Sequence, residues 1–194
     1  DAGESNSDKI SNEDRVSITL TNILSGYIGI LYFIDDAGLT LVDSMLLAPS
    51  EESLTFLHNT DDTRIYQYTS VQVDTAGNRS GYGDTLSIEI DHTLPSAQIS
   101  FEGDSLVRSG DVSTIATFKF SEPMDNVNVP RVDINYPEVD FLLDLTSQPL
   151  TEGSSDSVWT FVIPLNSAGL DTIDGAIELT VNASDVAGNE ILAD

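Results

Sequence analysis

Carboxylates are the side chains of this sequence most able to do chemistry, because it contains no cysteine and only two histidines. One acidic motif occurs twice, as Asp74-Thr75-Ala76-Gly77-Asn78 and as Asp185-Val186-Ala187-Gly188-Asn189. Asp and Asn oxygens are ligands that Ca²⁺ prefers, and the ion takes about six to eight of them. The same residues also form a tight corner unaided, because Gly and Asn tolerate positive φ and an Asp carboxylate accepts hydrogen bonds from amides two residues on. The motif therefore indicates either a corner or a corner that also ligates a cation.

Catalytic chemistry has little support in the sequence. His58 and His92 are isolated, no Gly-x-Ser-x-Gly nucleophile motif occurs, and no histidine pair has the spacing of a zinc site. The adjacent acids Glu51-Glu52 and Asp61-Asp62 do not suit a glycosidase, because neighbouring side chains on a strand point to opposite faces. The sequence thus predicts a protein that is not an enzyme.

The net charge limits the classes of molecule that this chain is expected to bind. The chain has 33 acidic and 7 basic residues, a net charge of −26, and Asp outnumbers Glu two to one. Such a field repels nucleic acid and anionic headgroups, so no nucleic-acid partner is expected. No run of about eighteen apolar residues occurs, so no membrane insertion is expected either. The acids are either cation ligands or a solubilising surface of the kind found in proteins adapted to salt.

The elements that must position these acids are strands, since apolar and polar residues alternate with period two and no segment has a helical stripe. The alternating segments are 16–20, 86–90, 97–101, 116–120, 159–163 and 177–183. Clusters of turn-forming residues separate them, including a predicted turn at 151–156. Short half-buried strands of this kind are typical of a sandwich. The predicted fold class is all-β, with two tandem immunoglobulin-like β-sandwich domains.

The repeated motif sets the number of domains. Its second copy lies 111 residues after the first, and each copy follows an alternating strand. Between the copies, the segment from Asp91 to Pro95 suits a short stiff linker, because proline donates no ladder hydrogen bond and holds the preceding residue extended. We therefore predict two domains, of residues 1–93 and 94–194.

Three aromatic residues are expected to serve the fold. Tyr66 follows the Asp61-Asp62 pair at a strand start, the usual place of a tyrosine corner that bonds back to the backbone. Trp159 and Phe161 share one strand face and are predicted to lie in a core. Alternation does not settle which face of the strand around Tyr66 is buried, because Val71 and Val73 favour the opposite face.

At these motifs the sequence resembles the bacterial immunoglobulin-like repeats of large surface adhesins and biofilm-associated proteins. Those repeats carry an Asp-x-Ala-Gly-Asn turn, matched at 74–78 and 185–189, and an Asp-Thr-Thr-Ala-Pro-like linker, matched at 91–95 with His92 and Leu94 as departures. Segments 1–12, 117–123 and 174–177 match further short motifs of such repeats. The resemblance implies a secreted or surface-anchored rod of several domains, often stiffened by calcium.

Placing the acids on a sandwich predicts a calcium site. The last turn and the entry of an immunoglobulin-like domain lie at the same end, so the second corner is expected near the linker. The loop at 122–128 is expected at that end too, and the loop at 59–62 of the first domain projects toward it. The predicted Ca²⁺ ligands are Asp61, Asp62, Asp91, Glu122, Asp125, Asp185 and Asn189. The expected consequence is a rigid pair of domains.

The edges of the predicted domains are uneven. No convincing first strand precedes Val16, and only residues 190–194 follow the second corner, so the final strand of the second domain is short or absent. An open edge beside the strand at 177–183 invites pairing with another chain. Two explanations stay open: the chain is a segment of a longer repeat array, or a strand from a neighbour fills the gap.

The predicted function is a non-catalytic structural or adhesive module of an extracellular microbial surface protein, acting as a calcium-stiffened spacer. The expected partners are neighbouring immunoglobulin-like domains of the same or an adjacent chain. The alternatives are a module that recognises a glycan or a protein on a host or surface, and a subunit of a surface filament or envelope lattice assembled by strand addition. An exposed aromatic row or a polar cleft would favour recognition.

Overall fold

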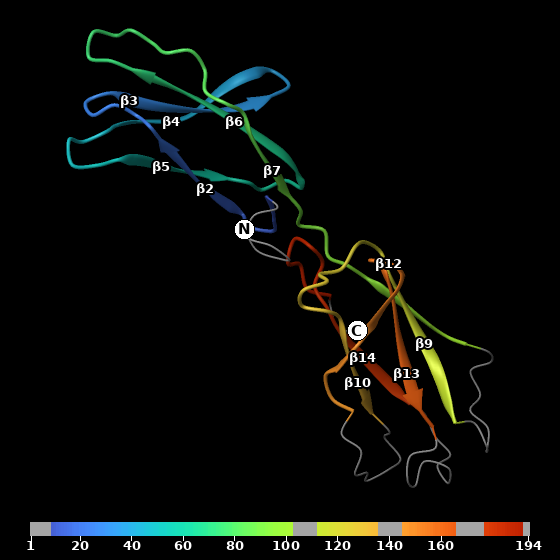
Figure 1. Cartoon of the computed structure of the whole chain (residues 1–194). Coiled ribbons are helices and arrows are strands. Elements are labelled where there is room, and N and C mark those ends of the chain that lie inside the picture. Colours follow the sequence, from blue (N-terminus) through green and yellow to red (C-terminus); the bar gives the residue numbers. More distant parts are fainter. Residues whose placement is uncertain (1–8, 103–111, 136–144, 166–176, 192–194) are drawn as a thin grey trace. The chain divides into compact units, whose positions relative to one another are not determined.

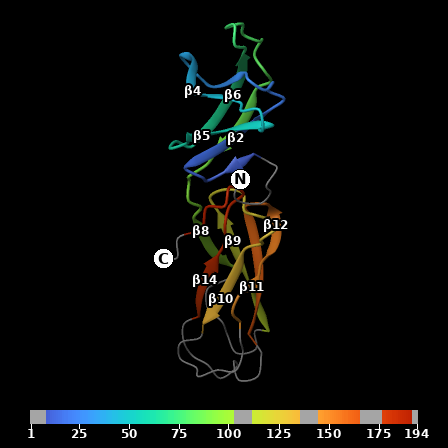
Figure 2. The same cartoon turned by 90° about the vertical axis from the view of Figure 1, so that its left-hand side faces the viewer.

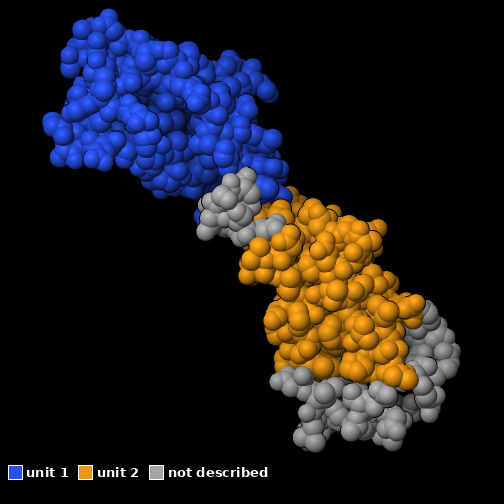
Figure 3. All heavy atoms as spheres, in the orientation of Figure 1, with its two compact units in different colours: residues 1–2, 6–92 blue, residues 3–5, 93–194 orange. Residues whose placement is uncertain are grey.

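The structure is a computed structural model that describes residues 9–102, 112–135, 145–165 and 177–191. These residues form strands, turns and loops, with no helix among them. They fall into two compact units, of which unit 1 contains residues 9–92 and unit 2 begins at Thr93 (Figure 3). Each unit has its own hydrophobic core. No helix long and apolar enough to span a membrane occurs in the part of the chain described.

Unit 1 consists of two sheets (Figure 1). The larger sheet has the order β1 (Ile10–Ser11), β7 (Leu86–Ile90), β6 (Arg64–Val73), β3 (Ile28–Asp35) and β4 (Gly38–Leu46). The smaller sheet pairs β2 (Arg15–Thr21) with β5 (Ser53–Asn59). The short β1 runs parallel to β7, and the other described pairs are antiparallel. This division of consecutive strands between two sheets is that of an immunoglobulin-like sandwich.

The core of unit 1 lies between the two sheets. On β2 and β5 every second side chain is buried or half-buried, which is the two-residue period of a strand with one face on a core. The buried apolar side chains from the two sheets are Val16, Ile18, Leu54 and Phe56 on one side and Leu31, Phe33, Tyr66, Tyr68 and Ile90 on the other. Burial of each such side chain contributes about 1.5–3 kcal/mol before the entropic cost of ordering it.

Unit 2 is a second sandwich, seen with the smaller sheet toward the viewer in Figure 2. Its larger sheet has the order β12 (Thr151–Ser155), β13 (Val158–Pro164), β9 (Ser113–Phe120) and β8 (Ala97–Phe101). Its smaller sheet has the order β11 (Gln148–Pro149), β10 (Arg131–Asn135) and β14 (Glu178–Asn182). All pairs described in this unit are antiparallel.

The core of unit 2 is built around one tryptophan. Trp159 of β13 is 2% exposed, and its indole N–H donates to the Asp156 carbonyl at 2.8 Å. The other buried apolar residues of this core include Phe118, Phe120, Met124, Val132, Ile134 and Ile163. Phe161 is half-buried and packs against the same cluster. The prediction that Trp159 and Phe161 serve the core is therefore confirmed.

The predicted fold class is confirmed, because every described element is a strand and each unit is a sandwich. The predicted strands at 86–90 and 97–101 coincide with β7 and β8, and the other four alternating segments overlap β2, β9, β13 and β14. The tyrosine corner is also confirmed: the Tyr66 hydroxyl accepts a hydrogen bond of 3.2 Å from the Asp62 amide. Tyr66 and Tyr68 face the core, which settles the orientation of β6.

Two predictions about strands were wrong. A first strand does precede Val16: β1 pairs with β7, and the amides of Glu89 and Asp91 donate to the carbonyls of Lys9 and Ser11. A two-residue strand is too short to show alternation, so the sequence carries no sign of it. The predicted turn at 151–156 is instead mostly β12, an edge strand with a register shift between Glu152 and Ser155. Its residues are exposed on both faces, so its polar composition is that of a loop.

Candidate cation site and the repeated corners

The first corner is closed by one carboxylate in unit 1. Asp74 Oδ1 accepts hydrogen bonds from the amides of Ala76 at 2.9 Å and Asn78 at 2.8 Å, while Oδ2 accepts one of 2.8 Å from the Asn78 side chain. Gly77 has φ of +86°, a left-handed value that favours glycine. The hydrogen bonds from the Asn78 side chain and the nearby amides hold the pKa of Asp74 below its usual range.

The second corner has the same construction in unit 2. Asp185 Oδ1 accepts from the Asn189 amide and Oδ2 from the Asn189 side chain, both at 2.9 Å. The backbone bond from the Asp185 amide to the Asn189 carbonyl is 3.0 Å long, as is the bond from Asp74 to Asn78. Gly188 has φ of +92°. The corner interpretation of the repeated motif is therefore confirmed in both copies.

The two corners differ in burial. Asn78 is exposed and Asp74 is half-buried, whereas Asp185 is 1% exposed and Asn189 is also buried. In unit 2 the loop after β9 packs on the corner. Met124 forms an isolated antiparallel β-bridge with Asp185, and the Asp125 amide donates a hydrogen bond of 2.9 Å to the Ser184 carbonyl. The same sequence motif thus lies on the surface in one unit and under a loop in the other.

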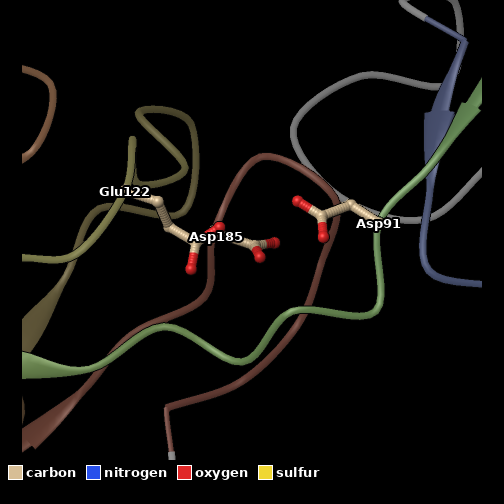
Figure 4. Close-up of side chains that lie close together, drawn as sticks. All are labelled: Asp91, Glu122 and Asp185. Atoms are coloured by element: carbon tan, nitrogen blue, oxygen red, sulfur yellow. The ribbon is translucent and has the colours of Figure 1, made fainter. Parts of the chain in front are cut away.

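Two of the predicted ligands lie close together in unit 2. Carboxylate oxygens of Glu122 and Asp185 lie within 4.8 Å of each other. Glu122 comes from the loop after β9 and Asp185 from the corner after β14, as Figure 4 shows. This separation is compatible with two oxygens of one hard cation, which lie on a sphere of about 2.3–2.6 Å radius.

Asp125 is buried in the same loop but serves the loop itself. Its Oδ1 accepts from the amides of Val127 at 2.7 Å and Asn128 at 3.0 Å, and its Oδ2 accepts from the Asn128 side chain at 2.7 Å. These contacts repeat the pattern of the corners, with an Asp oxygen on backbone amides and the other on an Asn side chain. Asp125 therefore has a structural role.

The predicted ligands in unit 1 lie near its linker end. Asp91, also labelled in Figure 4, follows β7, and its amide donates to the Ser11 carbonyl at 2.9 Å. Asp61 and Asp62 are exposed in the loop between β5 and β6. Within the described part of the chain, neither belongs to a group of three clustered acids. That the predicted residues share one ion stays a prediction.

The carboxylates near the corner of unit 2 suit a bound cation. Asp125 and Asp185 are each 1% exposed, and their hydrogen-bond partners among the described residues are backbone amides and asparagine side chains, all neutral. Among the described residues, no lysine or arginine forms an ion pair with either carboxylate. Buried carboxylates are costly without a positive partner, and a bound cation beside Asp185 and Glu122 would offset that cost.

Both histidines have partners within the fold of unit 1. His58 Nδ1 and the Tyr68 hydroxyl are 2.9 Å apart, and His92 Nε2 lies 2.9 Å from the Thr60 carbonyl. Burial, and then the nearby positive charge of Arg64, lower the pKa of His58. Burial raises the pKa of Tyr68. These contacts give each ring a role in the sandwich.

The outer face of the larger sheet of unit 1 is a feature that the sequence analysis missed. Leu39, Leu41 and Leu46 of β4 are 43%, 57% and 61% exposed. They lie directly opposite Ile34, Tyr32 and Ile28 of β3 and therefore share a face with them. Tyr32 also packs edge-on against the exposed Tyr82, with ring centroids 6.3 Å apart, and its hydroxyl accepts a hydrogen bond from Arg79. The sequence does not reveal this face, because apolar residues on both faces of β3 and β4 hide the two-residue period.

No protein-family model matches the chain, and no curated protein matches it. Fibronectin(III)-like modules of Clostridium thermocellum CbhA are similar in structure, with 13% identity, a TM-score of 0.46 and coverage of 97% of this chain and 88% of theirs. A tetra-tandem repeat from the extending region of a large adhesion protein has 14% identity and a TM-score of 0.34, and it covers 95% of this chain. The chain spans 44% of that repeat structure. At these values neither similarity extends to function.

Proposed function

We propose that this chain is a non-catalytic structural or adhesive module of an extracellular microbial surface protein, in which the two sandwiches are successive repeats of a spacer. The observation that most supports this proposal is the repeated corner, because the same hydrogen bonds occur twice, 111 residues apart. The first corner follows β6 and the second follows β14. Tandem copies of one structural unit are the architecture of repeat proteins. The proposed partners are neighbouring immunoglobulin-like domains.

The surface location is tested by labelling intact cells of the source organism with an antibody raised against this chain. Label on unpermeabilised cells is expected. Label that appears only after permeabilisation would count against the proposal. A second antibody, against a cytoplasmic protein of the same cells, controls for leakage.

The spacer is proposed to bind Ca²⁺ through Glu122 and Asp185, with further oxygens from the other predicted ligands or from water. The support is the pair of carboxylates within 4.8 Å and the burial of Asp185 among neutral donors. A ligand that binds only the folded state raises stability by mass action, by about 2.7 kcal/mol at a hundred times its Kd. The melting temperature should therefore rise with millimolar Ca²⁺ and much less with Mg²⁺, which demands a tighter octahedral site.

Matched variants make this test specific. Glu122→Gln with Asp185→Asn should abolish the calcium-dependent rise in melting temperature. Asp36→Asn, an exposed acid in the turn between β3 and β4, should leave the rise intact. An equal rise in both variants would show that the ions act on the overall negative charge and not at a site.

A second candidate function is recognition of a protein through the outer face of unit 1. The observation that favours it is the row of exposed leucines on β4 beside Tyr32 and Tyr82. Exposed apolar and aromatic side chains on one face often mark an interaction site.

A binding assay tests this second candidate function. Beads coated with the chain should bind the surface of cells from the source community. Leu39→Ser, Leu41→Ser and Leu46→Ser together should remove that binding, while Leu57→Ser, an exposed leucine on β5, should not.

A further inference from the structure

The outer face of the larger sheet of unit 1 has an apolar layer of its own. Val71 of β6 is 5% exposed but does not belong to the core between the two sheets. It lies opposite Ile30 of β3, on the outer side of the sheet. The segment 79–83 contacts this side through Thr69, whose hydroxyl donates to the Gly83 carbonyl at 2.9 Å. The half of the face over β6 is therefore covered by the chain itself.

The half of the same face over β3 and β4 has no such cover among the described residues. Leu39, Leu41 and Leu46 of β4 are 43%, 57% and 61% exposed, and Ile28 of β3 is 38% exposed. Residues 9–102 are described without a gap, so nothing between β1 and β7 lies over these side chains. An apolar layer that is covered on one half and open on the other suits completion by a second molecule.

The outer face differs in charge from the rest of the chain. The only charged residues of β6, β3 and β4 are Asp35, Asp43 and Arg64, and they lie on the inner side of the sheet, as Leu31 does. The chain as a whole has a net charge of −26. Two copies that met at most other surfaces would place acids against acids, whereas two outer faces would not.

The charges that border the outer face suit its pairing with itself. Arg79 donates a hydrogen bond to the Tyr32 hydroxyl, which holds one positive charge beside the face. Glu89 of β7 lies at one border, and Asp36 lies at another, in the turn between β3 and β4. A face with a base and acids at its borders offers opposite charges to a copy of itself, as a two-fold symmetric pair requires.

We propose that a second copy of this chain covers the open half, with the two outer faces stacked about a two-fold axis. Stacked sheets pack about 10 Å apart, with the side chains of their facing sides interleaved. Leu39, Leu41 and Leu46 would then be buried against the outer face of the other copy. This inference rests on the recognition proposed above for the outer face, and it names the partner.

The size of the face sets the strength that we expect. β3 has eight residues. With about 3.3 Å per residue and about 4.8 Å between strands, a face three strands wide has roughly 400 Å² of flat area in each copy. A stacked pair then buries about 800 Å² before the relief of the side chains is counted, and interfaces below about 1,200 Å² in total belong to weak complexes. The pair should therefore form reversibly, at high concentration or between arrays of many copies.

Sedimentation equilibrium of the full chain tests the pairing, with a chelator present so that bound calcium makes no contribution. The average mass should rise from 20.9 kDa toward that of a dimer. The concentrations should reach about 1 mM, where weak complexes populate. Raising the salt concentration from about 0.05 M to about 0.5 M should strengthen the pairing, because salt screens the repulsion between two acidic copies. Weakening by salt would mean that ion pairs hold the copies together.

Matched variants locate the contact. Leu41→Glu places an unpaired charge in the proposed interface and should weaken the pairing at least about tenfold. Leu57→Glu adds the same charge at an exposed leucine of β5, on the other sheet, and should leave the pairing unchanged. Both variants should keep their far-UV circular dichroism. Amide NMR signals of β3 and β4 should shift on dilution, while those of β2 and β5 should not.

A chain that stays monomeric at the highest concentration, or equal weakening by Leu41→Glu and Leu57→Glu, overturns the proposal. The bead assay separates this failure from a failure of recognition itself. If the partner is a second copy, coated beads should not bind cells that lack the gene for this chain. Binding to such cells that still requires Leu39, Leu41 and Leu46 would keep recognition through the outer face and overturn the second copy as its partner.

Discussion

At the scale of single residues, one five-residue motif does the same work in two environments. Asp74 and Asp185 each close a corner by accepting the amide and side-chain hydrogen bonds of an asparagine four residues on. In unit 1 the water around the corner can replace these bonds. In unit 2 both partners are buried, so the Asp185 carboxylate depends on the donors that the corner supplies.

This difference predicts unequal effects of the same substitution. Asn189→Ala leaves the buried Asp185 Oδ2 without its side-chain donor, which should lower the free energy of unfolding by about 1–3 kcal/mol. Asn78→Ala removes the equivalent donor from a carboxylate that is only half-buried and should have a much smaller effect. Urea denaturation of the two variants measures both values. Equal losses would mean that burial does not set the strength of the corner.

His58 makes the stability of unit 1 depend on pH. Its folded-state pKa is lowered from the ordinary value of 6.5 by burial and by Arg64, so the unfolded chain binds a proton more readily. The stability that the neutral His58 ring contributes to unit 1 is fully present above about pH 6.5, and it is lost as the pH falls through the lowered folded-state pKa. The nearby charges of Arg64 and Asp61 should shift the pKa of His58 in opposite directions. Arg64→Gln should raise the pKa of His58, and Asp61→Asn should lower it further, as measured by NMR titration of the ring.

At the scale of elements, the sequence predicted the strands that have one wet face and one buried face. β2 and β9 show alternation because polar residues dominate their outer faces, and β13 shows it through its inward-facing Trp159 and Ile163, although Val162 on its outer face is 57% exposed. β3 and β4 escaped prediction because apolar residues occupy both of their faces, so period two is hidden. β1 depends on a pairing partner far along the chain, which local composition does not record. β12 pairs with the adjacent strand β13, but all of its residues are exposed, so it has no apolar face that alternation could reveal.

Gly153 in the missed strand β12 provides a test of its geometry. A Cβ atom at Gly153 would lie 2.8 Å from the backbone oxygen of Val158, so Gly153→Ala should force the two strands apart. The expected loss in the free energy of unfolding is about 1–3 kcal/mol, the usual cost of overpacking. Gly81→Ala is the control, because a Cβ at Gly81 meets nothing within 4 Å. If the two variants unfold at the same urea concentration, Gly153 is not packed as described.

At the scale of the whole molecule, the candidate site was predictable only in part. Sandwich topology placed the loop after β9 beside the corner after β14, and Glu122 and Asp185 lie close together as a result. The structural role of Asp125 was not foreseen, because its hydrogen bonds to Val127 and Asn128 depend on how one loop folds back on itself. The exposed apolar face of unit 1 depends on the register between β3 and β4, which the sequence alone does not fix.

The last prediction concerns how the chain responds to calcium as a whole. With a net charge of −26, the chain repels itself along its length, and any cation weakens that repulsion by screening. Specific binding by the predicted ligands should do more: it should restrict motion between successive domains of a spacer. Small-angle scattering should therefore change when a chelator removes Ca²⁺ at constant ionic strength, and Glu122→Gln with Asp185→Asn should remove that change. Identical scattering with and without chelator would leave screening as the whole effect of the acids and would refute calcium stiffening.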